Sequence, residues 1–463
     1  MRINYLLFLL PYCLICIACQ EAPSLENISG VDDIVSDIVA TQIESGQVAG
    51  LSVGIAKGEN VLFQKGYGYA DLEFKIPTPS DARYEIGSVT KQFTAAAILQ
   101  LVEQGKLVLT EDIRSFFPDF DYRGHTITVG QLLDHTSGII SYTEMDVFGA
   151  IAKEDLPRDT LVNLVSQAGF DFKPGEAMIY NNSAYFMLGL IIEQVSEMSY
   201  EAYVEKHLFE PAGMNDSYYC SESAVVHHRA HGYQPNREGS LDRAAYLNHL
   251  WPYAAGSLCS TIKDLIAWNQ ALHKDRIILG EHAYQQMITP ASLNDGTPLR
   301  YAKGIISSTI GGKPVIQHGG GIFGFVSDLR YFPEEDLSIV VLINTSGPAS
   351  PARISMTIAQ TLIDFEEQEA QEFEGDKEQI TGLYQGRGRG QDLDVEVSIN
   401  GGVMKLDFAE GYDQELVYIG DGIWEQKKEQ VHRLLAQLTP AKEGSNLLLD
   451  VGTGLYVLNK VDN

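Results

Sequence analysis

Positive charge is scarce in this chain of 463 residues, which has 33 Lys and Arg against 62 Asp and Glu and a formal net charge of −29. A surface this acidic repels phosphate backbones and anionic lipid headgroups. The short basic stretch Arg387-Gly388-Arg389 is therefore predicted to be a turn and not an RNA-binding tract. We accordingly expect no nucleic acid among the partners of this protein.

Cysteine is also scarce, and three of the five cysteines fall within the first 19 residues. In that segment Arg2 precedes an apolar run over residues 5–17, which is too short to span a bilayer comfortably. A small residue, Ala18, directly before Cys19 resembles the bacterial lipoprotein signal, although Cys16 stands where that signal usually has leucine. Residues 1–18 are thus predicted to be a signal peptide of lipoprotein type, with a lipid anchor on Cys19 as the expected membrane contact and simple secretion as the alternative.

For a bacterial source, these features predict secretion across the inner membrane, to a periplasmic or membrane-anchored location. The cysteines left in the mature chain are Cys220 and Cys259. A disulfide between them and two buried free thiols both remain open at this point.

Strand patterns on both sides of a long helical region predict the main fold. A helix is expected over residues 31–43 and a β-hairpin over residues 51–67, and the patterns from 88 to 293 are mainly helical. Further strands are expected at residues 303–310, 314–318, 325–332 and 337–343. Together they predict an α+β domain over residues 31–366, in which helices flank one antiparallel sheet and an all-helical lobe is inserted.

The remainder of the chain divides by composition. Residues 19–30 are polar and predict a tether, and residues 367–376 are acidic and predict a linker. Short alternating segments at 393–399, 403–408, 447–451 and 456–458 predict a small all-β, barrel-like domain over residues 377–463. No reactive group of residues is evident in that domain, so it is expected to shield the cleft or to stabilise the fold.

The chemistry of the chain is expected at Ser88-Val89-Thr90-Lys91, which starts a long apolar helical stretch that ends near Gly105. Residues three apart lie on one face of a helix, so the Lys91 amine can reach the Ser88 hydroxyl. A serine alone is a poor nucleophile. An amine whose charge is suppressed by burial can accept the serine proton, and the oxygen can then attack a carbonyl carbon.

The same spacing recurs at Ser260-Thr261-Ile262-Lys263, so the pattern alone proves nothing. Here Thr261 is followed three residues later by Asp264, which is the signature of a helix N-terminus. Lys263 would then face solvent. We therefore assign Ser260 a structural role.

Two further patterns resemble binding motifs without their context. Gly319, Gly321 and Gly324 spell a dinucleotide fingerprint, but that motif requires a helix next, and residues 325–332 predict a strand. His227, His228 and His231 lie close together in the sequence without a fitting pattern of Cys or acidic ligands. A solvated loop is the better interpretation, and no metal or cofactor is expected.

Two more motifs accompany Ser88-Val89-Thr90-Lys91. Tyr180-Asn181-Asn182 is a Tyr-x-Asn sequence, and His318-Gly319-Gly320 is similar to a Lys-Thr-Gly-type strand and to its His-x-Gly variants. In this order and spacing the three motifs resemble the serine β-lactamase and penicillin-binding protein superfamily. The resemblance is closest to class C β-lactamase-like serine hydrolases of the D-alanyl-D-alanine carboxypeptidase and esterase type, and it covers residues 31–366.

This resemblance implies a β-lactamase-like fold and a set of site residues. The implied catalytic residues are Ser88 as nucleophile, Lys91 as its activating partner and Tyr180 as the proton shuttle to the leaving group. The implied substrate-binding residues are Asn182, His318, Gly320 and Gly321. The oxyanion would lie between the backbone N–H groups of Ser88 and Gly321, where glycine lets the backbone approach the substrate closely.

Some assignments compete or stay open. Tyr246-Leu247-Asn248 also matches Tyr-x-Asn, but no Pro-Gly turn precedes it and no long apolar helix follows it directly, so we regard it as coincidental. Without the other two motifs, Tyr180 and Asn182 would be interpreted as turn residues. His135 is either close to the site or purely structural.

Departures from the β-lactamase pattern bear on the substrate. A lysine in the third motif would supply a permanent positive charge, whereas an unperturbed histidine titrates near about 6.5 and is mostly neutral at pH 7. Gly319 also replaces a hydroxyl residue that could hold a substrate carboxylate. Efficient penicillin hydrolysis is therefore disfavoured, while esters, D-amino-acid amides or peptides and peptidoglycan stems remain open.

The leading hypothesis is a secreted serine hydrolase that cleaves a small-molecule ester, amide or D-peptide through an acyl-Ser88 intermediate. One alternative is a non-hydrolytic, penicillin-binding-like sensor or binding protein. Among enzymes, the alternative to a cell-wall D-peptidase is a small-ester esterase.

Overall fold

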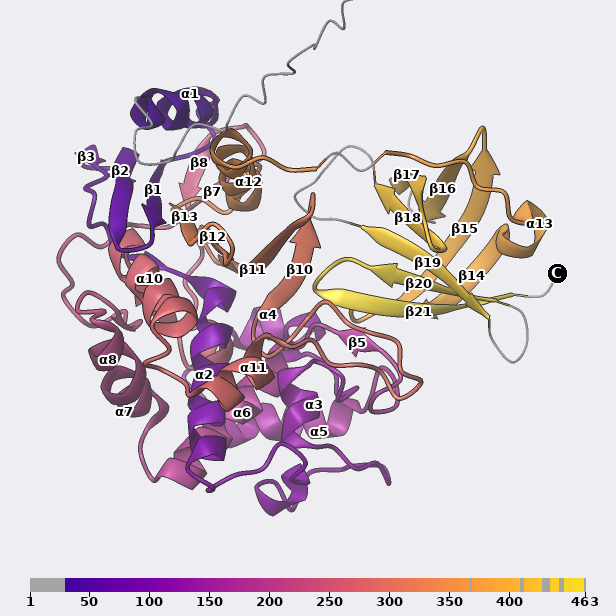
Figure 1. Ribbon diagram of the computed structural model, residues 1–463. Coiled ribbons are helices and arrows are strands. Elements are labelled where there is room, and N and C mark those ends of the chain that lie inside the picture. The colour runs from indigo at the N-terminus through magenta and orange to yellow at the C-terminus, as the bar shows by residue number, and fades with distance from the viewer. Residues whose placement is uncertain (1–29, 367–368, 409–411, 427–433, 441–444, 462–463) are drawn as a thin grey trace, which may run out of the picture.

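The computed structural model describes residues 30–366, 369–408, 412–426, 434–440 and 445–461 (Figure 1). The predicted signal peptide, Cys19 and the tether up to residue 29 lie outside these residues, and what we expect of them stays a prediction. Among the described residues, no helix combines the length and the apolar character needed to cross a bilayer.

A seven-stranded antiparallel sheet forms the centre of the main domain, with the order β10-β11-β12-β13-β1-β2-β3. Its strands are β1 (Gly50–Lys57), β2 (Asn60–Asp71), β3 (Ile76–Pro77), β10 (Ile306–Ile310), β11 (Lys313–Ile322), β12 (Phe325–Phe332) and β13 (Leu337–Ile343). The pairing of β1 with β13 joins the two ends of the domain, with Leu51 opposite Ile343. The predicted single sheet is thereby confirmed.

Helices cover both faces of this sheet (Figure 1). One face packs against α1 (Val31–Glu44) and α12 (Pro351–Leu362), and the other against α2 (Thr90–Glu103) and α10 (Ile262–Asn269). Because both of its faces are covered, the central strand β13 is buried along its whole length, which explains its continuous apolar sequence.

The inserted lobe between the two parts of the sheet is mainly helical, as predicted. Its helices are α3 (Val129–Leu133), α4 (Phe148–Ile151), α5 (Arg158–Ala168), α6 (Asn182–Ser196), α7 (Tyr200–Val204), α8 (Glu210–Ala212), α9 (Tyr253–Gly256) and α11 (Glu281–Ile288). Its short strands, which the sequence analysis did not predict, are β4 (Tyr84–Glu85), β5 (Met178–Ile179), β6 (Tyr218–Tyr219), β7 (Tyr233–Pro235), β8 (Leu241–Arg243) and β9 (Leu258–Ser260).

A disulfide joins Cys220 to Cys259, which resolves the alternative that the sequence left open. Cys220 follows β6 directly and Cys259 lies within β9, and these two strands pair in the order β4-β9-β6. The bond therefore fastens the small sheet from which the Ser88 turn departs.

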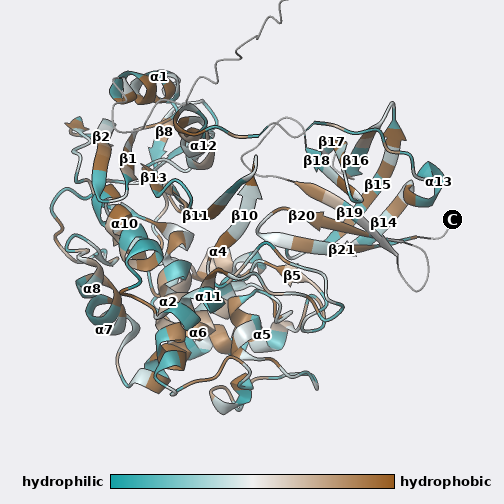
Figure 2. Ribbon diagram, in the orientation of Figure 1, coloured by the Kyte–Doolittle hydropathy of each residue, from teal (hydrophilic) through white to brown (hydrophobic). Residues whose placement is uncertain are grey.

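The C-terminal domain is a closed eight-stranded antiparallel barrel, as the barrel-like prediction required. After α13 (Lys377–Ile380), its strands are β14 (Gly382–Arg387), β15 (Asp392–Asn400), β16 (Val403–Phe408), β17 (Tyr412–Gly420), β18 (Ile423–Gln426), β19 (Leu435–Pro440), β20 (Ser445–Asp450) and β21 (Gly454–Lys460). Sequential neighbours pair, and β14 closes the barrel against β21. In β15, buried valines alternate with exposed acidic residues, so one face points into the barrel core (Figure 2).

The barrel is joined to the main domain by backbone and side-chain contacts. Strand β21 continues the barrel sheet onto β5, pairing Gly454 with Ile179. Arg300 of the main domain forms a bidentate ion pair with Asp450 of the barrel. The described part of the predicted linker, residues 369–376, contains no helix or strand, and the exact domain boundaries stay a prediction.

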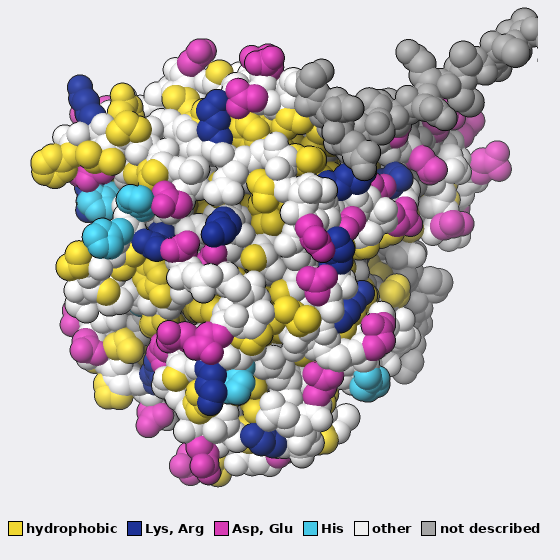
Figure 3. Space-filling model, turned by 60° about the vertical axis from the view of Figure 1, so that its left-hand side comes forward, with side chains coloured by type: hydrophobic (Ala, Val, Ile, Leu, Met, Phe, Trp, Pro, Cys, Tyr) yellow, Lys and Arg dark blue, Asp and Glu magenta, His cyan; other side chains and the backbone are white. Residues whose placement is uncertain are grey.

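The distribution of charged side chains on the described surface agrees with the acidic composition of the chain. On the face in Figure 3, Lys and Arg side chains lie dispersed among Asp and Glu, and no continuous basic patch forms there. The expectation that nucleic acid is not a partner remains a prediction.

Candidate active site

Ser88 lies on a tight turn at the start of a buried helix. The turn is a 3-10 segment, Gly87–Val89, that runs directly into α2. Gly87 has a φ of +52°, in the left-handed region that glycine adopts without strain. The Lys91 side chain, one turn later, brings its Nζ to 3.2 Å from Ser88 Oγ. The predicted Ser-Lys pair is therefore in contact.

Lys91 is completely buried and held from two further sides. Its Nζ donates to the Asn182 side-chain oxygen at 2.8 Å and to the Ala255 carbonyl at 2.8 Å. Burial, assisted by the positive charge of Arg389, holds the pKa of Lys91 well below its usual value. A neutral amine has two N–H groups and one lone pair. With both N–H groups engaged by Asn182 and Ala255, the lone pair is left for the Ser88 hydroxyl.

Tyr180 directly follows β5, and its ring lies beside the lysine. Nζ of Lys91 is 4.6 Å from the ring centre. The Tyr180 hydroxyl is buried and interacts with the Ser88 side chain, without a well-aligned hydrogen bond to any other described residue. Burial raises the pKa of Tyr180 above its usual value, so the phenol keeps its proton at neutral pH.

His135, whose role was left open, packs behind Tyr180. The two rings are 4.5 Å apart, and His135 Nδ1 accepts a hydrogen bond from the Asn181 backbone N–H at 3.1 Å. Burial lowers the pKa of His135 well below its usual value. A neutral imidazole in this place positions the Tyr180 ring.

His318 on β11 is buried, and its contacts define its protonation state. Its Nδ1 lies 2.6 Å from the Gly319 carbonyl and therefore donates to it, while its Nε2 accepts from the Tyr301 hydroxyl at 3.0 Å. Burial is the main reason that the pKa of His318 lies well below its usual value. The expectation of a neutral histidine in the third motif agrees with these contacts.

The glycines of the third motif let β11 pack tightly against the Ser88 turn. A Cβ on Gly320 would lie 2.1 Å from the Ile86 carbonyl oxygen, and a Cβ on Gly87 would lie 2.8 Å from the Gly321 nitrogen. Any side chain would therefore separate the two segments. The close approach brings the Gly321 backbone next to the Ser88 turn, as an oxyanion hole formed by both requires.

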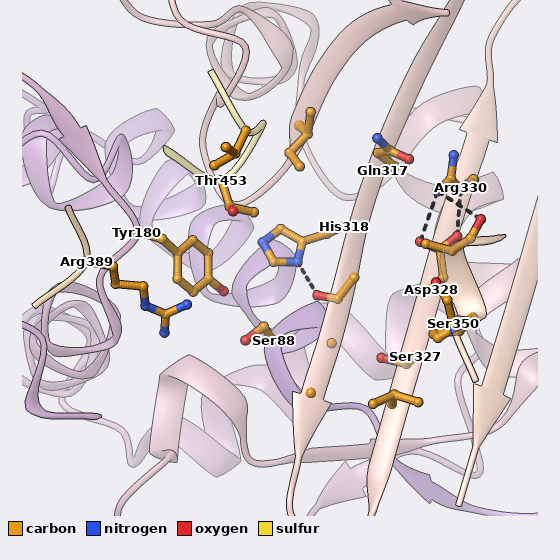
Figure 4. A pocket seen from close by; sticks show the side chains of 18 residues that line it. Ser88, Tyr180, Gln317, His318, Ser327, Asp328, Arg330, Ser350, Arg389 and Thr453 are labelled. Carbon is orange, nitrogen blue, oxygen red and sulfur yellow. Dashed lines mark hydrogen bonds and ion pairs between the residues drawn. The ribbon is translucent and has the colours of Figure 1, made fainter. Parts of the chain in front are cut away.

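Ser88 opens into two hollows. A cavity of about 330 Å³ is lined by Ser88, Tyr180, His318, the three glycines and Arg389 (Figure 4). A smaller hollow of about 110 Å³ shares Ser88 and is lined by Tyr142, Thr143, Phe148, Asn182, Leu247, Pro252, Ala255, Gly256, Gly321, Ile322 and Phe323. Six of the seven predicted site residues thus line one or both hollows, and the seventh, Lys91, contacts Ser88 directly. Arg389, which comes from the barrel, was not among the predicted site residues.

The rejected motifs lie in structural surroundings. The Ser260 hydroxyl bonds to the Ser217 hydroxyl at 2.8 Å, and Lys263 is exposed. The Tyr246 side chain is 49% exposed and does not border Ser88. Gly319 and Gly321 lie in β11, and β12 follows where a nucleotide fold would need a helix.

Among the described residues, two groups of acidic residues and histidine come together outside this site. One contains Asp71, Glu73 and His231, and the other Glu85, Glu222 and His249. Each also contains an arginine, since Arg243 pairs with Glu73 and Arg229 with Glu222. A cation would meet that positive charge, so we interpret both groups as ion-pair networks.

Comparison with known proteins agrees with this geometry. The family model described as Beta-lactamase matches residues 32–362. Penicillin-binding protein 4* of Bacillus subtilis (strain 168) is 27% identical over 305 residues, which are 62% of this chain and 66% of that protein. The chain therefore spans less than two thirds of the length of that relative.

Two solved structures share the fold. The octameric penicillin-binding protein homologue from Pyrococcus abyssi is 27% identical with a TM-score of 0.64, covering 93% of this chain and 100% of that chain. A D-stereospecific amidohydrolase from Streptomyces sp. is 25% identical with a TM-score of 0.61, covering 72% and 98%. Fold and site geometry are thus of the β-lactamase and penicillin-binding type. The chain belongs to the beta-lactamase family, which confirms the resemblance drawn from the three motifs.

Proposed function

We propose that the protein cleaves an ester or amide bond through an acyl intermediate on Ser88, with Lys91 as its base and Tyr180 as its proton donor. The observation that carries this proposal is the buried Lys91 amine, whose Nζ lies 3.2 Å from Ser88 Oγ. A positively charged lysine in this place would only hold the serine, whereas a neutral one activates it.

Acylation would proceed as follows. The Ser88 proton passes to Lys91 Nζ while Oγ bonds to the substrate carbonyl carbon. The backbone N–H groups of Ser88 and Gly321 stabilise the oxyanion, and losing one such donor typically costs about 3 kcal/mol. The Tyr180 hydroxyl, which interacts with the Ser88 side chain, gives its proton to the leaving amine or alkoxide as the bond to carbon breaks. Water then attacks the acyl carbon and gives a proton to the Tyr180 phenolate, while Lys91 returns its proton to Ser88 Oγ as the acyl bond breaks.

For the substrate we propose an amide or peptide of a D-amino acid. The structural neighbour named a D-stereospecific amidohydrolase supports this class, and so does the likeness to penicillin-binding proteins. A neutral His318 in place of a lysine weakens the binding of a β-lactam carboxylate by the third motif, so penicillins are expected to be poor substrates.

We also propose that the chain is exported. The Cys220–Cys259 disulfide supports this location, because such bonds persist in oxidising compartments. Lipidation of Cys19 would be tested by labelling cells that express the wild type or Cys19→Ser with a radioactive or clickable fatty acid. Equal labelling of both proteins would contradict the anchor.

A fluorophosphonate probe followed by peptide mapping tests the mechanism. We expect an adduct on Ser88 in the wild type, no adduct in Ser88→Ala, and full labelling of Ser88 in the matched control Ser260→Ala. A folded wild-type protein that forms no adduct would contradict the hydrolase mechanism and favour the sensor or binding protein.

Paired substrates then identify the reaction. D-alanine anilide, L-alanine anilide and a chromogenic butyrate ester should separate a D-specific amidase from an esterase. Faster turnover of the D-anilide than of the L-anilide is expected. Cleavage of the butyrate alone would support the small-ester esterase instead.

A further inference from the structure

The barrel contributes a side chain to the cavity at Ser88. The turn between β14 and β15 carries Arg389, which lines the 330 Å³ cavity and whose guanidinium carbon lies 5.4 Å from the centre of the Tyr180 ring. Figure 4 shows Arg389 beside Tyr180, on the same side of the cavity. Its side chain is 41% exposed, so it is open to a ligand.

Contacts with the main domain hold this arginine in position. Its Nε donates to the Glu144 carboxylate at 2.7 Å. On the same turn Arg387 pairs with Asp171 at 2.6 Å and fastens the turn to the helical lobe. Among the described residues, the two terminal nitrogens of Arg389 have no hydrogen-bond partner. This end of the guanidinium is the fork that binds a carboxylate through two parallel hydrogen bonds.

Among the described cations that line this cavity, Arg389 is the exposed one, and its pair with Glu144 engages Nε and leaves both terminal nitrogens for a ligand. Arg330, which lines the same cavity, is 1% exposed and pairs with Asp328 at 2.7 Å. His318 donates and accepts as a neutral ring, as its contacts with Gly319 and Tyr301 require. An anionic substrate group in the cavity would therefore bind to the barrel and not to the third motif.

The two hollows differ in which proposed site residue they contain. Tyr180 lines the 330 Å³ cavity and not the smaller hollow, whereas Asn182 lines the smaller hollow and not the cavity. A leaving group must lie within reach of the Tyr180 proton, so it occupies the cavity that contains Arg389. The acyl part then faces the smaller hollow, whose lining is largely apolar.

We propose that Arg389 binds a carboxylate on the leaving group, so that the protein prefers amides and peptides that end in a free carboxylate and carry a small apolar acyl residue. This inference rests on the proposed acyl-Ser88 mechanism. It assigns to the C-terminal barrel the charge that His318 does not supply.

A matched pair of substrates tests the assignment. N-acetyl-D-valyl-D-alanine and its C-terminal carboxamide differ only in the charge that Arg389 would bind. We expect the wild type to have a kcat/KM about 10- to 100-fold higher for the carboxylate. In Arg389→Gln this ratio should fall to about one, because cleavage of the carboxylate substrate becomes slower. Arg389→Lys should retain part of the preference. The ratio is the readout because any effect of Arg389 on Lys91 acts on both substrates and cancels.

Lys405→Gln is the control, because Lys405 is another positive charge on the barrel, pairs with Asp413 and does not line the cavity. It should leave the ratio unchanged. If Arg389→Gln leaves the ratio unchanged, the proposal is overturned. If kcat/KM for both substrates also falls equally, the arginine only holds the barrel in place.

Binding can be separated from turnover by protecting Ser88 from the fluorophosphonate probe. The free carboxylate should slow labelling of the wild type more than the carboxamide does, and this difference should vanish in Arg389→Gln. Equal protection by both compounds would refute the role of Arg389 while the labelled Ser88 still supports the hydrolase mechanism. Absence of labelling altogether would refute the mechanism itself.

Discussion

The two Ser-x-x-Lys sequences of this chain have different surroundings in the fold. In Ser88-Val89-Thr90-Lys91 the lysine is buried and its Nζ contacts the serine at 3.2 Å. In Ser260-Thr261-Ile262-Lys263 the lysine is exposed and the serine bonds to Ser217. The strands that lead into the two sequences are neighbours, since Tyr84 of β4 pairs with Ser260 of β9. Their chemistry nevertheless differs.

The direction of the following helix makes the difference. Helix α2 runs through the core, so Lys91 loses its hydration and its charged form becomes unfavourable. Helix α10 packs one face on the sheet and leaves Lys263 in water. A four-residue motif acquires catalytic meaning from burial, which depends on residues far from it in the sequence.

Replacing each of the two lysines by alanine should give the largest difference in catalytic activity between the two motifs. Lys91→Ala removes the proposed base, and we expect kcat/KM to fall by about 10³-fold, within the usual range for general base catalysis. Lys263→Ala should change it by less than about twofold, because an exposed side chain away from the site rarely matters. Steady-state kinetics on the D-anilide measure both.

Thermal unfolding of both variants is the necessary control. If Lys91→Ala is folded and retains more than a tenth of the wild-type activity, another group acts as the base. If Lys263→Ala loses activity to the same extent, the distinction between the two motifs is wrong.

Much of this contrast could be predicted from the sequence. The apolar residues after Lys91 indicated a buried helix, and Thr261 with Asp264 indicated a capped helix start. Strands β12 and β13 have the predicted bounds, because their patterns are long and uninterrupted. Barrel strands β14, β17, β18 and β19 were missed, since their alternation is weak and interrupted by polar residues and glycine.

The contribution of the barrel to the site could not be predicted. Arg389 has the sequence context of a surface turn, and the pairing of β21 with β5, together with ion pairs such as Arg300–Asp450, brings the barrel against the segment that carries Tyr180. Long-range contacts of this kind leave no local pattern. The disulfide was undecided for the same reason, because its two cysteines are 39 residues apart in the sequence and meet through the pairing of β6 with β9.

The next prediction concerns the pH dependence of stability near strand β4, which leads to Ser88. His249 lies between Glu85 on β4 and Glu222. Burial alone would lower the pKa of His249, but its hydrogen bonds to Glu222 and Glu85 outweigh burial and raise it to about 9. A folded-state pKa above the unfolded value of about 6.5 stabilises the protein below pH 6.5, and this contribution is lost as pH rises through 9. The free energy of unfolding should therefore decrease by about 3 kcal/mol between pH 6.5 and pH 10.

Urea denaturation at several pH values measures this dependence. In His249→Gln the decrease over the same pH interval should be largely absent. An identical slope in wild type and His249→Gln would mean that the histidine is neutral in the folded protein. Turnover at pH 7 should change little, since His249 borders neither hollow at Ser88.

The suppressed charge of Lys91 should also be visible in the pH dependence of turnover. Protonation of Lys91 removes the base, so kcat/KM should fall about tenfold per pH unit below its pKa. The titratable and charged groups that face Lys91 are His135, His318, Tyr180, Tyr185 and Arg389. Both histidines have lowered pKa values and both tyrosines raised ones, so the acidic limb reports on Lys91.

Arg389→Gln sharpens this measurement. Removing the positive charge raises the pKa of Lys91, so the acidic limb should move to higher pH. Arg389→Lys keeps the charge and should leave the limb near its wild-type position. A limb that stays in place in Arg389→Gln would show that burial alone sets the pKa of Lys91. The D-anilide is the suitable substrate, because its leaving group carries no carboxylate.

Thr261→Ala should give the smallest effect and test the structural assignment of the second motif. The Thr261 hydroxyl accepts from the Asp264 backbone N–H at 3.1 Å and caps α10, whereas α2 begins without a side-chain cap because it continues the Ser88 turn. Loss of such a cap typically costs about 1 kcal/mol, so the free energy of unfolding should fall by that amount while kcat and KM stay unchanged. Thr261→Ser, which keeps the hydroxyl, should restore most of the stability. A loss of turnover at unchanged stability would instead give this motif a part in catalysis, because a helix cap acts on folding and not on the reacting atoms.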